Sequence, residues 1–485
     1  MSLLRSNLVV ASGTALSRLS GLARITVFGY VIGQTALADA YRIGNETPNI
    51  VYELLLGGVL SATLVPLFTS FDHREDEEST NVVITVSLVL LGGITLVALV
   101  AAPLIFSLYT LNPGGGVDPE LFHDVGTLLT RLFLLQIFFY GATALATAIL
   151  NSRRRFFAAA WSPIVPNLII IASLLSLPGA GSTGWTLDDV VDDSRVRWTL
   201  GLGATAGIAA MALVLIPAVR RSGLHFRPRL EFRHPAVRRL LTLSGWTLGY
   251  VVANQVVIVV VRNLADPGSG DATAYFDAYT FFVLPHGLLA MSIATTFAPE
   301  MARAVARHDR DAFTARASLG VRLIGLLTVP AGILLFVLRG FYAHQDTRTP
   351  FVINLFECAL NIVLAFALVG RYGILGLGLA FAISYVVSAL WSLQVLSYKV
   401  PTFAFGSVFR RLLPMIVAGV FAGEVMWLVA VNVGGNSGGE AVLRLAVAGL
   451  VGIAAYVAAL FVLRVPEVTG IVDRIRAVRP SPSET

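Results

Sequence analysis

The chain has 485 residues, of which 56% are hydrophobic and 13% are charged, and its mean hydropathy is +0.78. These values exclude a water-soluble globular protein and indicate a membrane protein that crosses the bilayer many times. The net charge of +6 does not indicate nucleic-acid binding, because the arginines lie in short loops beside apolar segments. The single cysteine, Cys358, excludes an intramolecular disulfide and a multi-cysteine metal site.

Apolar segments predict an all-α polytopic membrane protein with about thirteen transmembrane helices, at ~20 residues per crossing. The predicted spans are 8–33, 48–71, 82–110, 125–150, 157–178, 197–219, 241–263, 273–304, 319–342, 351–370, 373–398, 408–432 and 441–464. Basic loops, which the positive-inside rule places in the cytoplasm, lie at 153–155, 220–239 and 303–316. No cleavage site follows the first span, so this span is expected to stay as a helix.

The first span carries two arginines, Arg18 and Arg24. Each costs about 2.5–3.5 kcal/mol at mid-membrane, so this helix is expected to line a wet or anionic cavity. The two side chains are about 120° apart on an ideal helix, and they serve one cavity if it is wide or if the helix bends at Ser20-Gly21. The alternative is that they snorkel to the interfaces or pair with an acid.

Polar residues are dense between the first and second spans. Pro48 is predicted to begin the second helix at its first turn. Asn49 and Glu53 then share one face and could pair with Arg24 or Arg18. Glu53 is costly among apolar side chains unless it is paired or protonated. It is either a gate or proton site, or the neutralising partner of an arginine.

Later spans carry few polar residues. Asn254 is predicted to line the interface between two lobes, and His286 is a candidate proton carrier. Glu357 and Asn361 share a face and could contribute to a cation site, but one carboxylate and one amide are few ligands. We therefore predict no metal site.

Two short patterns recur in the same order and indicate two similar halves, as in many secondary transporters. Residues 61–74 resemble 293–310, and 151–167 resemble 344–361. The predicted parts are an N-terminal lobe, 1–222, a C-terminal lobe, 223–400, and two additional helices with a tail, 401–485. The second half is shorter by roughly one span with its loop. With 319–342 as one span where two are expected, either this segment is re-entrant or the C-terminal portion departs from the positive-inside rule. We favour a loss of about one span's worth of sequence there.

Signatures of enzymes are missing from the sequence. Gly201–Gly207 imitates a dinucleotide-binding loop, but it lies within a span and follows no strand. The chain has no phosphate-binding loop, nucleophile elbow or paired-histidine metal motif. It is therefore expected to be a transporter without a cofactor. An ion gradient or the membrane potential, worth about 2.3 kcal/mol per charge per 100 mV, would drive it.

Three blocks of sequence indicate a family. They are Ser17-Arg18-x-x-Gly21-x-Ala23-Arg24 followed by Ala38-Asp39-Ala40, Pro48-Asn49 and Gly58 to Pro66; Leu284-Pro285-x-Gly287 to Pro299; and Arg339-Gly-Phe-Tyr-Ala-x-Gln-Asp-Thr-x-Thr-Pro350. In this order they resemble the MurJ (MviN) lipid II flippases of the multidrug/oligosaccharidyl-lipid/polysaccharide exporter superfamily.

The resemblance implies a multi-pass protein of the bacterial cytoplasmic membrane, with two helical lobes around a central cavity. Such flippases move undecaprenyl-pyrophosphate-linked peptidoglycan precursor outward by alternating access, and they can have partners among cell-wall synthesis proteins. By resemblance, Arg18 and Arg24 bind the head group and Asp39 acts at the external gate. Asn49, Glu53 and Asn254 complete the predicted substrate-binding set.

Several positions depart from the family pattern. Ile25, Tyr52 and Thr280 stand where charged residues are found, and Ala365 replaces an acid of the sodium site. Three alternatives stay open: a flippase for another polyprenyl-linked glycan, a cation-coupled drug exporter of the same superfamily, and a non-transporting scaffold. The two arginines of the first span argue against drug export, because the usual substrates of such exporters are cationic.

Overall fold

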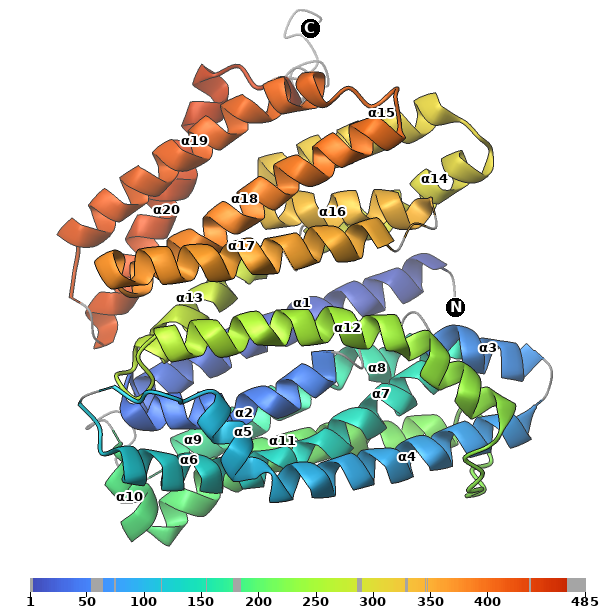
Figure 1. Cartoon of the computed structure of the whole chain (residues 1–485), viewed down its shortest axis with the longest axis vertical. Helices are drawn as coiled ribbons and strands as arrows, with labels where there is room; N and C mark the ends of the chain where they lie inside the picture. The colour runs from blue at the N-terminus through green and yellow to red at the C-terminus, as the bar shows by residue number, and fades with distance from the viewer. Residues whose placement is uncertain are drawn as a thin grey trace, which may run out of the picture. The chain divides into compact units, whose positions relative to one another are not determined.

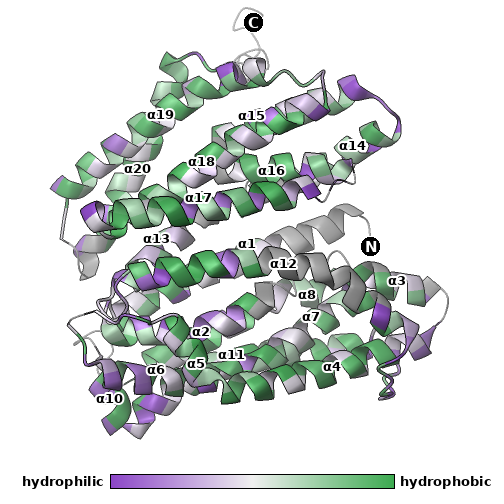
Figure 2. Cartoon of the chain, in the orientation of Figure 1, coloured by the Kyte–Doolittle hydropathy of each residue, from purple (hydrophilic) through white to green (hydrophobic). Residues whose placement is uncertain are grey.

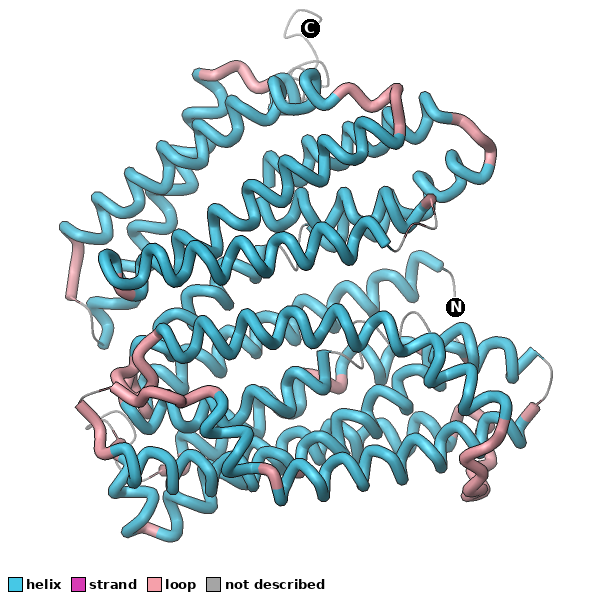
Figure 3. Tube along the Cα trace, in the orientation of Figure 1, coloured by secondary structure: helices cyan, strands magenta, loops and turns pink. Residues whose placement is uncertain are grey.

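The computed structural model describes residues 3–53, 64–73, 76–114, 116–153, 155–177, 185–285, 290–327, 330–344, 346, 348–435 and 438–468. These residues form helices joined by short loops, and no strand occurs among them (Figure 3). Eight helical segments in the described ranges are long and apolar enough to span a bilayer, and Val252–Leu264 and Gly332–Ala343 are shorter apolar helices. Hydrophobic residues cover most of the length of α4 (Glu77–Val100), as Figure 2 shows. The predicted all-α membrane class is confirmed.

Contacts divide the chain into two compact units, 1–280 with 358–381, and 281–357 with 382–485. Unit 1 contains α1 (Leu3–Val31), α2 (Ala36–Glu53), α3 (Val65–His73), α4, α5 (Ala102–Leu108), α6 (Pro119–Leu134), α7 (Gln136–Ser152), α8 (Phe156–Trp161), α9 (Ile164–Leu175), α10 (Leu187–Asp192), α11 (Ser194–Arg220), α12 (Pro235–Leu264), and parts of α13 (Asp271–Pro285), α17 (Arg348–Tyr372) and α18 (Ile374–Lys399). Unit 2 contains α14 (Met291–Ala306), α15 (Arg310–Leu327), α16 (Pro330–Ala343), α19 (Phe405–Asn432), α20 (Gly438–Val462) and the rest of α13, α17 and α18 (Figure 1). The lobes 1–222 and 223–400 and the additional helices of 401–485 remain a prediction, because lobes are defined by motion and these units by contact.

Helix α1 is held against α8 and α9 by close polar contacts. An ideal Cβ at Gly13 would lie 2.8 Å from the backbone oxygen of Ala160, so only glycine fits this approach. One turn further along α1, the Asn167 side chain of α9 donates to the backbone oxygen of Ser17 at 3.2 Å and to the hydroxyl of Ser20 at 2.9 Å. The face of α1 that includes Ser17 and Ser20 is therefore fixed within unit 1.

Helix α2 begins earlier than the sequence pattern indicated. It starts at Ala36, where the hydroxyl of Thr35 accepts a hydrogen bond from the backbone N–H of Ala38 at 3.2 Å. Pro48 lies inside the helix, so the prediction that Pro48 begins it was wrong. Leu37 and Ile43 are buried on the apolar side of the early turns, and this packing compensates for the backbone hydrogen bond that proline cannot make.

The segment predicted as one span, 319–342, belongs to two helices, α15 and α16. They pack antiparallel, since an ideal Cβ at Gly320 would lie 2.1 Å from the Phe336 ring, and one at Gly325 would lie 3.7 Å from Ile333. The single span was the wrong prediction, because the arginines and the aspartate in the early turns of α15 lower its hydropathy. The segment therefore supplies two helices in place of the predicted single span, and the loss of sequence there remains a prediction.

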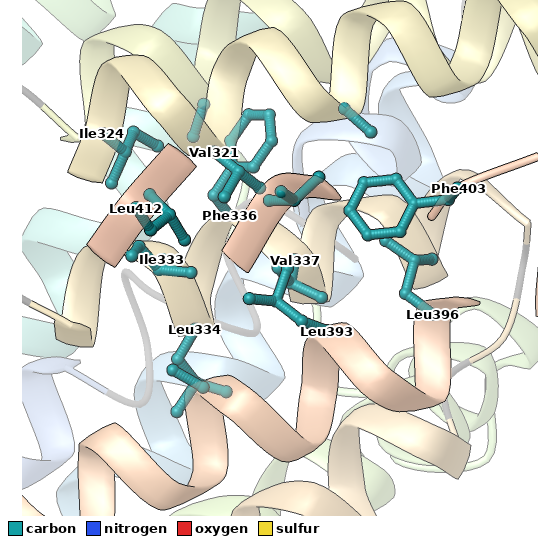
Figure 4. Close-up of a cluster of buried hydrophobic side chains, with 14 of the residues drawn as sticks. Val321, Ile324, Ile333, Leu334, Phe336, Val337, Leu393, Leu396, Phe403 and Leu412 are labelled. Carbon is teal, nitrogen blue, oxygen red and sulfur yellow. The ribbon is translucent and has the colours of Figure 1, made fainter. Parts of the chain in front are cut away.

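Unit 2 is organised around one apolar cluster (Figure 4). Its members from α15 and α16 include Val321, Ile324, Phe336 and Val337, and each is at most 1% exposed. Helices α18 and α19 add further leucines, among them Leu393 and Leu412. Packing of this density has few voids and resists deformation, so these helices form a stiff body.

Candidate functional site

Three charged residues share one face of α2. Asp39, Arg42 and Glu46 follow each other at spacings of three and four residues, so their side chains project from the same side of the helix. In unit 1 this face meets α12, α13 and the loop between them, as the contacts below establish. We call it the polar face of α2.

Asp39 is the most buried of the three and is fully hydrogen-bonded. Its side chain is 0% exposed. One carboxylate oxygen accepts from the backbone N–H groups of Gly268 at 3.0 Å and Gly270 at 2.9 Å. The other oxygen accepts from the backbone N–H of Thr273 at 2.8 Å and from its hydroxyl at 2.6 Å. Asp39 thus caps the N-terminal end of α13 from a neighbouring helix, where a negative charge is favoured.

The loop that donates to Asp39 depends on glycine. Gly268 has a φ of 97° and Gly270 a φ of 91°, in the left-handed region that side chains disfavour. A Cβ at Gly270 would also lie 2.7 Å from the backbone oxygen of Gln34. These two glycines let N–H groups two residues apart converge on one carboxylate oxygen, so the loop is shaped for this acceptor.

Arg42 joins α2 to α13. Its guanidinium lies 2.6 Å from a carboxylate oxygen of Asp277, and both side chains are more than four-fifths buried. The same guanidinium lies 4.8 Å from the centre of the Phe28 ring of α1. A planar, weakly hydrated cation on an aromatic face is a favourable use of arginine in a dry environment.

Arg262 joins α12 to α2 and is only 1% exposed. Its guanidinium lies 2.6 Å from Glu46 and 4.0 Å from the centre of the Phe276 ring. A second ring, that of Tyr109, lies 6.0 Å away. A buried arginine that lost its carboxylate would be left as an uncompensated charge, so this pair is expected to break only when another anion or water replaces Glu46.

Arg24 of α1 lies near the charged residues of the polar face of α2. It is half-buried, and Phe28, one turn further along α1, packs on Tyr41 of α2 with ring centres 5.0 Å apart. Arg24 is near enough to Tyr41 and Arg42 to act on both electrostatically. Among the residues that the structure describes, no carboxylate lies within ion-pair distance of Arg24.

We call Arg24, Arg42 and Arg262, with Glu46 and Asp277, the α2 arginine cluster. It holds three positive and two negative side chains, and the buried carboxylate of Asp39 lies one turn before Arg42 on the same helix face. Arg42 and Arg262 also act on each other electrostatically. Arg24 is the cation of this cluster that no described carboxylate pairs with.

The other predicted site residues are placed less directly. Arg18 is exposed on α1, and Asn254 is half-buried on α12. Asn49 accepts a hydrogen bond from the hydroxyl of Tyr140 at 2.9 Å. The side chain of Glu53 and all of His286 lie outside the described residues. The structure therefore brings Arg24 and Asp39 to the polar face of α2, while the roles of Arg18, Asn49, Glu53 and Asn254 remain predictions.

Metal-binding groups are sparse. No set of three or more His, Cys, Asp or Glu side chains converges among the described residues. In unit 2 Glu357 is 4% exposed and accepts from the hydroxyl of Ser384 at 3.1 Å. In unit 1 Ala365 is fully buried in an apolar cluster with Val261 and Leu377. An open pocket of about 490 Å³ near His123 in unit 1 is lined by loop and helix-end residues, and no side chain of the arginine cluster lines it.

Sequence reasoning missed Arg42, Glu46, Arg262 and Asp277 as site residues. The first two were assigned to a turn, although their spacing from Asp39 is helical. Arg262 lies 216 positions from its partner Glu46, so no local pattern connects them. The usable signal was the series of charged residues at spacings of three and four.

The sequence matches known proteins over most of its length. The family model described as lipid II flippase MurJ matches residues 28–340 and 333–447, in two pieces that meet within α16. A probable lipid II flippase MurJ of Rhizobium meliloti is 27% identical over 454 residues, covering 82% of this chain and 81% of the relative. A lipid II flippase MurJ of Burkholderia cenocepacia is 25% identical, covering 77% and 70%.

Solved structures show the same fold. A lipid II flippase MurJ in an inward closed conformation superposes with a TM-score of 0.71 at 20% identity, covering 94% of this chain and 99% of that one. An inward-facing multidrug resistance MATE family transporter of the MOP superfamily gives a TM-score of 0.58 at 13% identity, covering 81% and 95%. The family model extends over most of the sequence, and so the chain belongs to the lipid II flippase MurJ family.

Proposed function

We propose that this protein carries lipid II outward across the cytoplasmic membrane by alternating access. In this cycle the α2 arginine cluster would bind the pyrophosphate, and the polar face of α2 would close the external side. The protein is a transporter and not an enzyme, and its substrate is a lipid-linked precursor that lies in the membrane. The observation that carries the proposal is Arg24, a half-buried cation with no carboxylate partner among the described residues, beside two arginines held by acids.

The chemistry of the cluster fits a pyrophosphate. Arginine presents a planar fork of N–H donors that matches phosphate oxygens in pairs. Arg24 would bind first, and Arg42 and Arg262 could exchange Asp277 and Glu46 for phosphate oxygens without ever being left unpaired. Such an exchange avoids the cost of a bare buried charge. Arg18, Asn49, Glu53 and Asn254 would contact the rest of the head group.

Asp39 supports a gate role through its partners. Its four hydrogen bonds tie α2 to the first turn of α13 and to the loop before it. Opening between α2 and α13 would have to break these bonds together with the ion pair of Arg42 and Asp277. The gate would therefore stay closed until a substrate compensates for the lost contacts.

The driving force is proposed to be the membrane potential or an ion gradient, with no cofactor. The position that carries a sodium-site acid in the resembling family is Ala365, which supports the potential over a sodium gradient. Proteins of cell-wall synthesis are proposed partners. A flippase for another polyprenyl-linked glycan would use the same phosphate chemistry, so head-group selectivity distinguishes the two.

The test is rescue of cells depleted of their lipid II flippase, with variants of Arg24. Arg24→Ala is expected to abolish rescue, while Arg24→Lys keeps the charge and retains part of it. Arg195→Ala, on the exposed first turn of α11, is the matched control and should rescue fully. Equal rescue by Arg24→Ala and the parent chain would refute the binding role. Failure of the parent chain to rescue would favour the alternative that the protein is a non-transporting scaffold.

A further inference from the structure

The loop between α11 and α12, residues 222–234, is fixed in place at both ends. Leu224 lies near the start of the loop, and Ala236 lies just beyond its end. Both are buried in the apolar cluster that also contains Ala148 and Ile149 of α7. Arg153, at the end of α7, donates to the backbone oxygen of Ser222 at 2.8 Å. The path of the loop is therefore set by the unit 1 fold.

Between these ends the loop runs along α4. The Asn81 side chain donates to the backbone oxygen of His225 at 3.3 Å and accepts from the backbone N–H of Arg227 at 3.1 Å. Thr85 accepts from the backbone N–H of Arg229 at 3.0 Å. Thr85 lies eight residues after Glu77, the first residue of α4, which is about 12 Å along the helix axis. The loop thus folds back beside a membrane span, as the lime-green segment near the start of α4 in Figure 1 shows.

The outer side of this loop is apolar and basic. Phe226, Leu230 and Phe232 are 46%, 58% and 51% exposed, and the exposed Arg227 and Arg233 directly follow Phe226 and Phe232. The hydrogen bonds of Asn81 and Thr85 hold the loop backbone in place beside these side chains. Large exposed side chains that alternate with arginines are the pattern of a segment that lies in a membrane interface.

Charge identifies the lipid class. Residues 220–238 contain six arginines and one glutamate. The start of α4 offsets part of this charge, because Glu78 lies 2.8 Å from Arg229 and Glu77 lies 3.6 Å from His225. On the span beside the loop, Val89 and Leu90 lie four and five residues beyond Thr85 along α4 and are 47% and 38% exposed. A zwitterionic head group would cover the apolar side chains but would leave the excess positive charge unmatched. An anionic phospholipid would cover the apolar side chains and would also match the positive charge.

We infer that the α11–α12 loop is an interfacial anchor that binds anionic phospholipid of the cytoplasmic leaflet. Phe226, Leu230 and Phe232 enter the boundary between head groups and acyl chains, and Arg227 and Arg233 bind the phosphates. The site lies outside the α2 arginine cluster, so it is independent of the proposed transport function. Each arginine near the surface is expected to enrich anionic lipid by about fivefold.

The test places a fluorophore on Leu230→Cys of the full-length protein in nanodiscs; buried Cys358 stays unlabelled. One nanodisc sample contains brominated phosphatidylglycerol as about a third of the lipid, and the other contains the same share of brominated phosphatidylcholine. We expect the phosphatidylglycerol to quench the fluorophore several-fold more strongly. Arg227→Gln with Arg233→Gln, two exposed changes, should remove this difference while leaving the unfolding temperature unchanged.

Leu111→Cys is the matched control. It is 63% exposed on a loop of unit 1 without arginines, and it should show equal quenching by the two lipids. Absence of quenching at position 230 by either lipid would place the loop in water and overturn the inference. Equal quenching at position 230 by both lipids, unchanged in the arginine variant, would overturn the anionic selectivity.

Discussion

The polar face of α2 in unit 1 and the apolar cluster of unit 2 hold helices together by different means. The first uses two ion pairs and four hydrogen bonds to one carboxylate. The second uses interlocked apolar side chains from α14, α15, α16, α18 and α19. Polar contacts can be exchanged for those of a ligand, whereas packed side chains have no substitute partner. A transporter is thus expected to place polar contacts where it opens and apolar packing where it stays closed.

Arg262→Ala should give the largest effect on the polar side of this comparison. It leaves Glu46 without its partner in a buried setting and should lower the free energy of unfolding by about 3–5 kcal/mol. The double variant Arg262→Met with Glu46→Leu removes both charges and should recover much of that loss. Thermal unfolding in detergent measures both. If the double variant is no more stable than Arg262→Ala, the ion pair of Arg262 and Glu46 is not what holds α12 against α2.

Asp39→Asn should lower stability by about 2–3 kcal/mol. The amide keeps the shape of the carboxylate, but it replaces one acceptor oxygen by a donor that faces backbone N–H groups. We also expect loss of the gate, seen as failure to rescue flippase-depleted cells despite normal membrane levels. Asp266→Asn, an exposed change in the same loop, is the control. Rescue by Asp39→Asn at the parent level would show that the four hydrogen bonds of Asp39 are not needed for gating.

Gly320→Ala tests the apolar side of the comparison. The new Cβ would lie 2.1 Å from the ring of Phe336, which is 1% exposed. The free energy of unfolding should therefore fall by about 1–3 kcal/mol. Gly419→Ala in α19 meets nothing within 4 Å and should be neutral or slightly stabilising. Transport should fall only in proportion to the amount of folded protein. A transport defect at normal stability would contradict the assignment of unit 2 as a stiff body.

Lys399→Met should give the smallest change in the free energy of unfolding, below about 1 kcal/mol, because the Lys399 side chain is 47% exposed and water screens its ion pair with Asp346. Partial burial raises the pKa of Asp346, but hydrogen bonds from Lys399 and Thr349 outweigh it and hold the pKa at about 2. Because the pKa of Asp346 is lower in the folded protein than in the unfolded one, the Asp346 carboxylate stabilises the fold fully at pH values above its ordinary pKa of 3.8. This stabilisation is lost as the pH falls towards 2. The difference in unfolding temperature between parent and variant should thus be constant above about pH 4. A difference that grows in acid would contradict this sign.

The sequence predicted what lies within one helix and missed what joins distant ones. Arg24 could be found because a charged residue within an apolar span stands out, whereas Asp39 was indicated only by the resemblance to the family. The start of α2 was missed because Arg42 and Glu46 lower its hydropathy, and hydropathy cannot distinguish a polar helix face from a loop. The partner of Glu46 is set by the packing of α12 on α2, and no property of residue 262 alone indicates it.

The short helix α16 has a consequence for how this family can vary in length. Its 14 residues extend about 21 Å, less than the ~30 Å hydrocarbon layer. Residues 333, 334, 336–338 and 341 are nevertheless at most 7% exposed, so surrounding protein and not lipid forms the environment of this helix. A helix enclosed in this way has no hydrophobic length to match. Deletions can therefore accumulate there without deforming the bilayer, while the helices at the perimeter must keep their full span.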